Sequence, residues 1–448
     1  MPQYLLFFCV AILFLGCSTQ ESEQKKVTTH LTHDISTKAF SHPVHLTNDQ
    51  EDLFILGRSF FHIPWVEAPS ATTARDGLGP LFSANTCVSC HPNNSAGRLY
   101  TKEKALERSL VIRLASSYQK DLRYNEGFRI EPTYGGQLSV NGTSDVAYEG
   151  NIVVEWTKHK GHFADGEDYT LHSAKYKLTN LQYGALQEGA NVAPRLALPL
   201  VGLGLLEEVS EEEILKYEDI NDRDGDGISG KANRVFSPEH NKTMLGRFAY
   251  KATAVDIKHQ SANAAHNDMG LSNPLYPSEN CTSKQKECNE ALKGRHEFDL
   301  PQERLDAIAL YLRSMKAPAP RENEAFREGR EIFKSLGCGK CHRESFKTQN
   351  AKIIYPYSDL LLHDMGSELA DGHSDFLASA NEFRTTPLWG LGLREKLTGS
   401  LNLLHDGRAH SIEEAILWHG GEASSTKNAY RHLEKTQREM LLAFLEGL

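Results

Sequence analysis

Two short strings constrain this chain more than any other feature, and each has the form C-x-x-C-H. Their cysteines and histidines are Cys87, Cys90 and His91 in the first string, and Cys338, Cys341 and His342 in the second. In this pattern two thiols can form thioether bonds to one haem, and the adjacent histidine can bind its iron. A zinc site made from all four cysteines is the alternative, but the halves of structural zinc sites usually lie closer together. The sequence therefore predicts two covalently bound c-type haems.

Length and charge narrow the class of protein further. The chain has 448 residues, which is enough for two or three domains with hydrophobic cores. Its net charge of -10 argues against a nucleic-acid partner, which would favour a basic surface. We therefore expect a globular redox protein that does not bind nucleic acid.

The N-terminus predicts export. Residues 4–15 are apolar but too few to span a bilayer, as in the core of a signal peptide. Residues 14–17, Phe-Leu-Gly-Cys, resemble a bacterial lipobox, which predicts a signal peptide over residues 1–16 and lipidation of Cys17. Phe14 stands where Leu is usual, and no Lys or Arg precedes the apolar run, so a plain secretory signal is the alternative. The polar residues 17–45 predict a disordered tether. The expected location is the bacterial cell envelope, facing the periplasm, with the lipid anchored in the membrane.

Two cysteines remain unassigned after those of the signal peptide, the lipobox and the two haem strings are set aside. Cys281 and Cys288 lie in a polar segment. Export into an oxidising compartment favours a disulfide between them. A second metal site is the weaker alternative, because no pattern of histidines or acids brackets the pair.

The hydrophobic pattern suggests two haem domains. A Pro-rich stretch at residues 317–320 marks a boundary between an N-terminal haem domain, residues 46–320, and a C-terminal cytochrome c domain, residues 321–448. An insertion at about 105–240 has strand-like segments at 109–114 and 151–156. The predicted fold class is mainly α, with two cytochrome c-like haem domains, the N-terminal one enlarged by a mixed α/β insertion.

A run of alternating acids suggests a cation site. Asp222, Asp224 and Asp226, with Gly227 in the sixth place, match the first half of a calcium loop. The twelfth place, where an acid is expected, holds Asn233. A differently completed calcium site and an acidic turn without a cation both remain open.

Residues 50–448 resemble the bacterial di-haem cytochrome c peroxidases, most closely the di-haem oxidoreductase branch described as peroxidases or thiol oxidoreductases. Five segments carry the resemblance in order, and they are residues 77–91, 224–230, 360–366, 387–394 and 404–421. The resemblance implies that the N-terminal haem reduces peroxide, or another small oxidant, with electrons relayed from the C-terminal haem. The electron donor would be a small redox protein or a quinol-linked donor. The alternative function is a di-haem electron-transfer protein, or an oxidase of a protein or metal partner without peroxidase activity.

The resemblance also implies two protein ligands for the C-terminal iron. The related peroxidases carry a methionine ligand after a helix like residues 412–416, and His419 falls on that position here. Two imidazoles would lower the reduction potential relative to a His/Met pair. Met365 is the rival ligand, with packing against the haem edge as its other interpretation.

For the N-terminal haem, the resemblance implies three residues around the substrate. Tyr250, Gln260 and Asp268 reproduce the order of an aromatic residue, a glutamine and an acid, although the last spacing is shorter than usual and the acid is Asp rather than Glu. A carboxylate can move the proton of peroxide, and an amide can orient the molecule. Tyr250 could relay electrons between the haems or serve only as a packed aromatic residue. Asp268 could also cap a helix.

Overall fold

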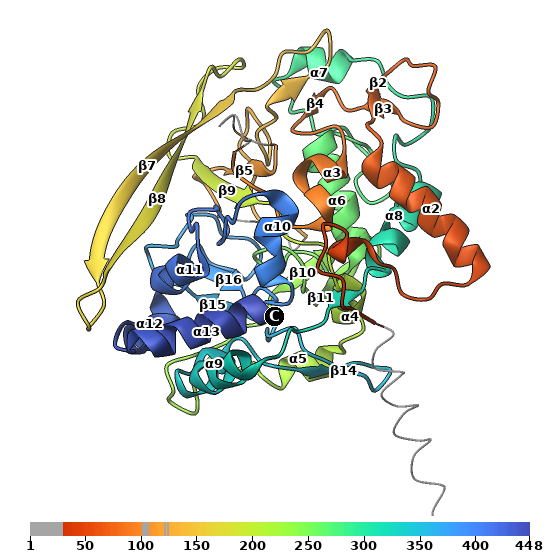
Figure 1. Ribbon diagram of the computed structural model, residues 1–448. Coiled ribbons are helices and arrows are strands. Elements are labelled where there is room, and N and C mark those ends of the chain that lie inside the picture. The colour runs from red at the N-terminus through yellow and green to blue at the C-terminus, as the bar shows by residue number, and fades with distance from the viewer. Residues whose placement is uncertain (1–29, 101–105, 107, 121, 123–124) are drawn as a thin grey trace, which may run out of the picture.

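The computed structural model describes residues 30–100, 106, 108–120, 122 and 125–448 (Figure 1). Helices make up 29% of the described structure and strands 21%. The prediction of a mainly α protein with cytochrome c-like domains is therefore wrong. The described strands pair into eight small two-stranded sheets. The reason is that Gly- and Pro-rich segments keep most helices short, so the intervening backbone groups find their hydrogen bonds in local strand pairs.

The helices and strands follow each other along the chain as labelled in Figure 1. The helices are α2 Asn48–His62, α3 Cys87–Cys90, α4 Leu203–Glu207, α5 Glu211–Leu215, α6 Ile257–Met269, α7 Lys286–Glu290, α8 Gln302–Arg313, α9 Glu324–Ser335, α10 Arg394–Thr398, α11 Ile412–Trp418, α12 Ser424–Arg431 and α13 Lys435–Gly447. The strands are β1 Leu31–Thr32, β2 Val66–Glu67, β3 Asp76–Leu78, β4 Leu81–Phe82, β5 Leu110–Ala115, β6 Asn141–Gly142, β7 Asn151–His162, β8 Asp168–Thr179, β9 Asn191–Leu196, β10 Arg234–Ser237, β11 Lys242–Leu245, β12 Ala317–Pro318, β13 Phe346–Lys347, β14 Ile353–Ile354, β15 Leu362–Asp364 and β16 Glu382–Arg384.

A close pair of helices, α2 and α8, supports the first haem string. Helix α2 begins at Thr47, whose side chain accepts the backbone N–H of Gln50 in a capping box. At Gly57 the two helices approach so closely that a Cβ atom would lie 1.9 Å from the carbonyl oxygen of Ala307. Any larger residue at this position would push α2 away from α8.

A second close pair, α9 and α13, supports the other haem string. Asn323 caps α9 by accepting the backbone N–H of Phe326 at 2.8 Å. A Cβ atom on Gly329 would lie 2.0 Å from the carbonyl oxygen of Met440 in α13. Phe326 packs against Phe444 in the core beside this crossing, with ring centroids 4.9 Å apart. Each haem string thus follows the first helix of a pair whose two helices meet closely at a glycine.

The predicted insertion contains the longest strands. Strands β5 and β7 begin close to where the sequence pattern predicts them, and β7 continues to His162. Strands β7 and β8 form an antiparallel hairpin that extends beside α11 and α12 in Figure 1. Near its tip, Phe163 is buried in the same core cluster as Tyr430, and Arg438 of α13 pairs with Asp165 at 2.9 Å. The hairpin therefore packs on the C-terminal half of the molecule.

Part of the predicted tether lies within the described residues. Leu31–Thr32 pair in parallel with Ala317–Pro318, and Phe40 is buried in the hydrophobic core. The predicted signal peptide and Cys17 lie outside the described residues. None of the described helices combines the length and the apolar character that crossing a membrane requires.

Candidate functional site

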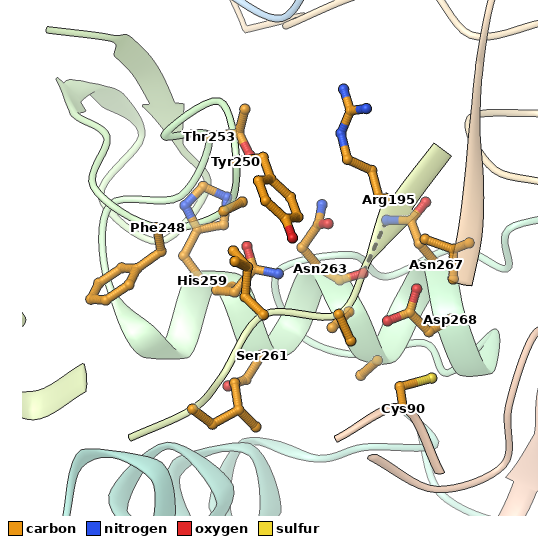
Figure 2. Close-up of a pocket in the computed structure, with 18 of the residues that line it drawn as sticks. Cys90, Arg195, Phe248, Tyr250, Thr253, His259, Ser261, Asn263, Asn267 and Asp268 are labelled. Atoms are coloured by element: carbon orange, nitrogen blue, oxygen red, sulfur yellow. Dashed lines mark hydrogen bonds between the residues drawn. The ribbon is translucent and has the colours of Figure 1, made fainter. Parts of the chain in front are cut away.

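The first haem string lies at the edge of a cavity of about 440 Å³. Cys87, Cys90 and His91 all line it, and Figure 2 shows Cys90 beside it. The Nδ1 atom of His91 lies 2.8 Å from the carbonyl oxygen of Leu198. Because that oxygen can only accept, Nδ1 carries the proton and Nε2 keeps its lone pair. Burial lowers the pKa of His91 to about 4, so the imidazole is neutral, as an iron ligand must be.

The second haem string lines a separate cavity of about 230 Å³. Cys338, Cys341 and His342 face it, and the Nδ1 atom of His342 lies 2.9 Å from the carbonyl oxygen of Tyr357. Burial lowers the pKa of His342 to about 4. A hydrogen bond from Nδ1 to a backbone carbonyl therefore orients this second histidine, as it does the first, and leaves Nε2 available to a metal.

The same cavity receives both predicted distal ligands. His419 follows the last residue of α11 and lines the cavity, and its Nδ1 atom lies 2.7 Å from the carbonyl oxygen of Ala415. Burial lowers the pKa of His419. Met365 lines the cavity as well and packs against the C-terminal core. The hydrogen bond of His419 leaves its Nε2 atom free, so the structure offers two neutral imidazoles to one iron.

Both cavities can accept the acidic edge of a haem. Arg394 lines the C-terminal cavity, and its Nε and Nη2 atoms are buried with no hydrogen-bond partner among the described residues. Burial lowers the pKa of Arg394 to about 10. Arg384 lines both cavities, and Arg195 lines the N-terminal one. Unpaired buried guanidinium atoms are costly, and a haem propionate would satisfy those of Arg394. Arg195 already pairs with Asp371, and Arg384 donates to backbone carbonyls, so both hold positive charge beside the cavities. The residues present therefore fit one haem in each cavity.

The four string cysteines do not form one zinc site. One pair lines the N-terminal cavity and the other pair lines the C-terminal cavity. Among the described residues, the groups close enough to share a metal ion include no cysteine. The zinc alternative is therefore excluded by geometry.

Tyr250 lies between the two cavities and lines both. Its hydroxyl donates to the carbonyl oxygen of Leu404 at 3.3 Å, and its backbone carbonyl accepts the N–H of Arg384 at 2.7 Å. Burial raises the pKa of the Tyr250 hydroxyl. The side chain is therefore neutral and bridges the space between the two predicted haem sites.

Helix α6 forms one wall of the N-terminal cavity and carries both other predicted residues. Asp256 caps the helix by accepting the backbone N–H of His259 at 2.7 Å. Gln260 and Asp268 line the cavity, and Figure 2 shows Asp268 beside it. Asp268 Oδ1 accepts a hydrogen bond from Gln137 Nε2 at 2.8 Å. Burial raises the pKa of Asp268, which the hydrogen bond from Gln137 opposes. A carboxyl group in this state can both give and take a proton.

Several residues that line this cavity were not predicted from the sequence. Asn263 and Asn267 lie on α6, and their helical spacing from Gln260 could have revealed them (Figure 2). Arg113 and Gln137 come from outside α6, and only the tertiary fold brings them here. His373, which is 1% exposed, also lines the cavity. Neither of its ring nitrogens has a hydrogen-bond partner among the described residues, and Nε2 lies 3.9 Å from Asp375. This buried imidazole is free to bind a ligand in the cavity.

The remaining predicted sites lie away from the cavities. Oxygens of Asp222, Asp224 and Asp226 come within 4.8 Å of one another. Asp226 also pairs with Lys340, a residue of the second haem string, at 3.0 Å. Asn233, at the twelfth place of the loop, is buried and bonds to the backbone of Lys251, so its side chain is committed to the core.

Cys281 and Cys288 form a disulfide, with their Cα atoms 5.8 Å apart. Cys288 is buried beside Leu81 and Val146. The bridge therefore closes a loop next to the strand that precedes the first haem string.

Comparison with known proteins identifies the family. A protein-family model described as "Di-haem oxidoreductase, putative peroxidase" matches residues 131–448. No curated protein and no solved structure matches the chain. The match covers the second haem string, both candidate distal ligands and helix α6, whereas the first haem string precedes it. This chain belongs to the family of di-haem oxidoreductases.

Proposed function

We propose that this protein is a c-type di-haem enzyme that reduces hydrogen peroxide in the N-terminal cavity with electrons that enter at the C-terminal haem. The observation that carries the proposal is the position of Tyr250, which lines both cavities, together with Asp268 in only one of them. The balanced reaction takes two electrons and two protons to convert one peroxide into two waters. When bound, the haems supply the iron that exchanges these electrons.

The residues divide the work between the cavities. His91 and His342 would each ligate one haem iron through Nε2, because a backbone carbonyl fixes their Nδ1 atoms. His419 lines the same cavity as His342 and would be the second protein ligand of the C-terminal iron, which would close that site to substrates and leave it for electron transfer. In the N-terminal cavity, the Asp268 carboxylate takes the first proton of peroxide and returns it to the departing oxygen. Gln260 orients the peroxide by hydrogen bonding.

The haems are attached through the thiols of Cys87 and Cys90, and of Cys338 and Cys341. Lipidation of Cys17 would place the enzyme on the periplasmic side of a bacterial membrane, where such attachment takes place. Its donor would be a small redox protein or a quinol-linked donor. A pyridine haemochrome assay should report two haems per chain, and the Cys87→Ser/Cys90→Ser variant should carry one.

The test of the relay compares two tyrosine variants. Tyr250→Phe removes the hydroxyl between the cavities, and we expect peroxide turnover with reduced cytochrome as donor to fall on the order of tenfold, or about 1.4 kcal/mol. Tyr430→Phe is the matched control, since Tyr430 is a buried tyrosine that lines neither cavity. Equal turnover in the wild type and both variants would show that the Tyr250 hydroxyl takes no part in electron transfer between the haems. Absence of turnover in a wild type that carries both haems would sink the peroxidase proposal.

A second candidate function, electron transfer without peroxidase activity, is favoured by His373. Its unpartnered ring lines the N-terminal cavity, and ligation by it would close that iron to peroxide. An EPR spectrum of the oxidised wild type separates the two candidates. One low-spin and one high-spin iron support the enzyme. Two low-spin irons, one of which becomes high-spin in His373→Ala, support the carrier.

A further inference from the structure

A cluster of two histidines and one glutamate lies outside both haem cavities. His172 comes from β8 of the long hairpin, His410 precedes α11, and Glu414 lies in the first turn of α11. One ligand atom from each of the three lies within 4.8 Å of the others. The hairpin and the helix are more than 200 residues apart in sequence, with 242 positions between His172 and Glu414. Only the packing of the hairpin on the C-terminal half creates this cluster.

The glutamate is held in place before any ligand arrives. Its side chain is 6% exposed. Glu414 Oε2 accepts the backbone N–H of His410 at 2.8 Å, and Oε1 accepts the backbone N–H of His172 at 2.5 Å. Among the described residues, no lysine or arginine pairs with this carboxylate, and its one ion-pair partner is the His172 ring. A buried carboxylate with so little compensating positive charge favours a bound cation.

The two imidazoles are placed to share that cation. His172 Nδ1 lies 3.0 Å from Glu414 Oε1, close to the separation of roughly 3–3.5 Å between two ligands of one ion at bond lengths near 2.1 Å. The rings of His172 and His410 have centroids 4.7 Å apart. His410 is exposed, so its ring can turn to close the remaining distance.

We infer that His172, His410 and Glu414 bind one divalent first-row transition ion, which joins the β7–β8 hairpin to helix α11. Two imidazoles and one carboxylate suit Zn²⁺ or Cu²⁺ and not Ca²⁺ or Mg²⁺, which prefer oxygen ligands. Of the transition ions, Cu²⁺ should bind most tightly. An ion at His172 Nδ1 requires the tautomer that carries the ring proton on Nε2.

The site faces away from the C-terminal cavity. Ile412, Ala415 and Ile416 of α11 line that cavity, whereas Glu414 lies on the opposite face of the same helix. His419 follows at the end of α11. A metal bound here therefore stabilises, from outside, the helix that leads to a proposed iron ligand. This inference does not depend on the reaction catalysed at the haems.

The test uses the haem-loaded protein without a polyhistidine tag, first treated with EDTA and then titrated with ZnCl₂ or CuCl₂ by calorimetry. We expect one equivalent to bind. His172→Ala and His410→Ala should each weaken metal binding at least about a hundredfold. Losing a residue that only hydrogen-bonds to a metal ligand costs up to about that much, and losing a ligand itself should cost no less. Both variants keep the backbone N–H groups that Glu414 accepts, so α11 stays capped.

His162→Ala is the matched control. His162 lies near the tip of the same hairpin and pairs with Asp168 at 2.7 Å, but the pair is exposed and belongs to no three-residue group among the described residues. Its loss should leave the affinity unchanged. With Cu²⁺ bound, pulsed EPR should show two imidazole nitrogens in the wild type and one in His410→Ala, and Zn²⁺ should raise the Tm of the wild type but not of His172→Ala. Equal affinity in all four proteins, or a copper signal without imidazole nitrogens, would overturn the inference.

Discussion

Glu149 is a buried carboxyl group whose replacement by glutamine should stabilise the protein at high pH. It is 2% exposed. One carboxyl oxygen accepts the backbone N–H of Ser139 at 2.5 Å, and the other accepts the side-chain N–H of Gln285 at 2.5 Å. Burial is the largest influence, and it raises the pKa from 4.5 to about 8, although both hydrogen bonds oppose it. At neutral pH the folded protein therefore keeps a proton that the unfolded chain has released.

The direction and size of the effect follow from this difference in pKa. Because the folded value lies above the unfolded value, the stability present below pH 4.5 is lost as the pH rises to about 8. At about 1.4 kcal/mol per pH unit, the loss in the wild type approaches about 5 kcal/mol. Glutamine has the shape of the protonated acid and does not titrate. We therefore expect Glu149→Gln to match the wild type near pH 4.5 and to exceed its free energy of unfolding by up to about 5 kcal/mol at pH 9.

The assay is unfolding of the haem-loaded proteins in guanidinium chloride at pH 5, 7 and 9, followed by far-UV circular dichroism. The difference between variant and wild type cancels the other titrating groups. Glu155→Gln is the control, because Glu155 is half exposed and pairs with Lys177 on the hairpin surface. It should change stability by less than about 0.5 kcal/mol at each pH. A Glu149→Gln variant with the same difference from wild type at pH 5 and pH 9 would refute the reasoning.

Four further variants test the sites. His419→Ala should convert one low-spin iron to high-spin in the EPR spectrum while Met365→Leu leaves it unchanged; the reverse pattern would make the methionine the ligand. Asp268→Asn should lower peroxide turnover about 100-fold or more without changing haem content, because it removes the proton-transferring group; wild-type turnover would exclude that role. The Cys281→Ser/Cys288→Ser variant should lose about 2.5 kcal/mol of unfolding free energy, as expected for a bridge with a sequence separation of 7, and unchanged denaturant midpoints would contradict this.

Local chemistry explains what the sequence could predict about the candidate site. The spacing within a C-x-x-C-H string already brings two thiols and an imidazole together, so no distant residue is needed to recognise it. The position of His419 after a short helix is equally local, and the structure places it in the cavity with His342. The strands at residues 110–115 and from residue 151 follow the local pattern of apolar residues. The prediction of a mainly α fold was wrong because short helices separated by Gly- and Pro-rich loops do not pack together into helical domains.

Packing between residues far apart in the sequence determined the other residues of the candidate site. The partner of Asp268 is Gln137, 131 positions away, and the unpartnered His373 joins the same cavity from a loop near the other end of the chain. Tyr250 lies between the two cavities because residues from both halves surround it.

The sequence by itself determined where the two C-x-x-C-H strings lie and that each brings two thiols and an imidazole together, because those residues are neighbours along the chain. Only the tertiary structure decided that the β7–β8 hairpin packs across the C-terminal half and brings His172 to Glu414. The physical reason is that hydrophobic burial has no direction of its own. The base of the hairpin packs against the core around Ile112 and Leu114, and its tip packs through Phe163 into the core that holds Tyr430, so the burial of distant apolar residues decides its position.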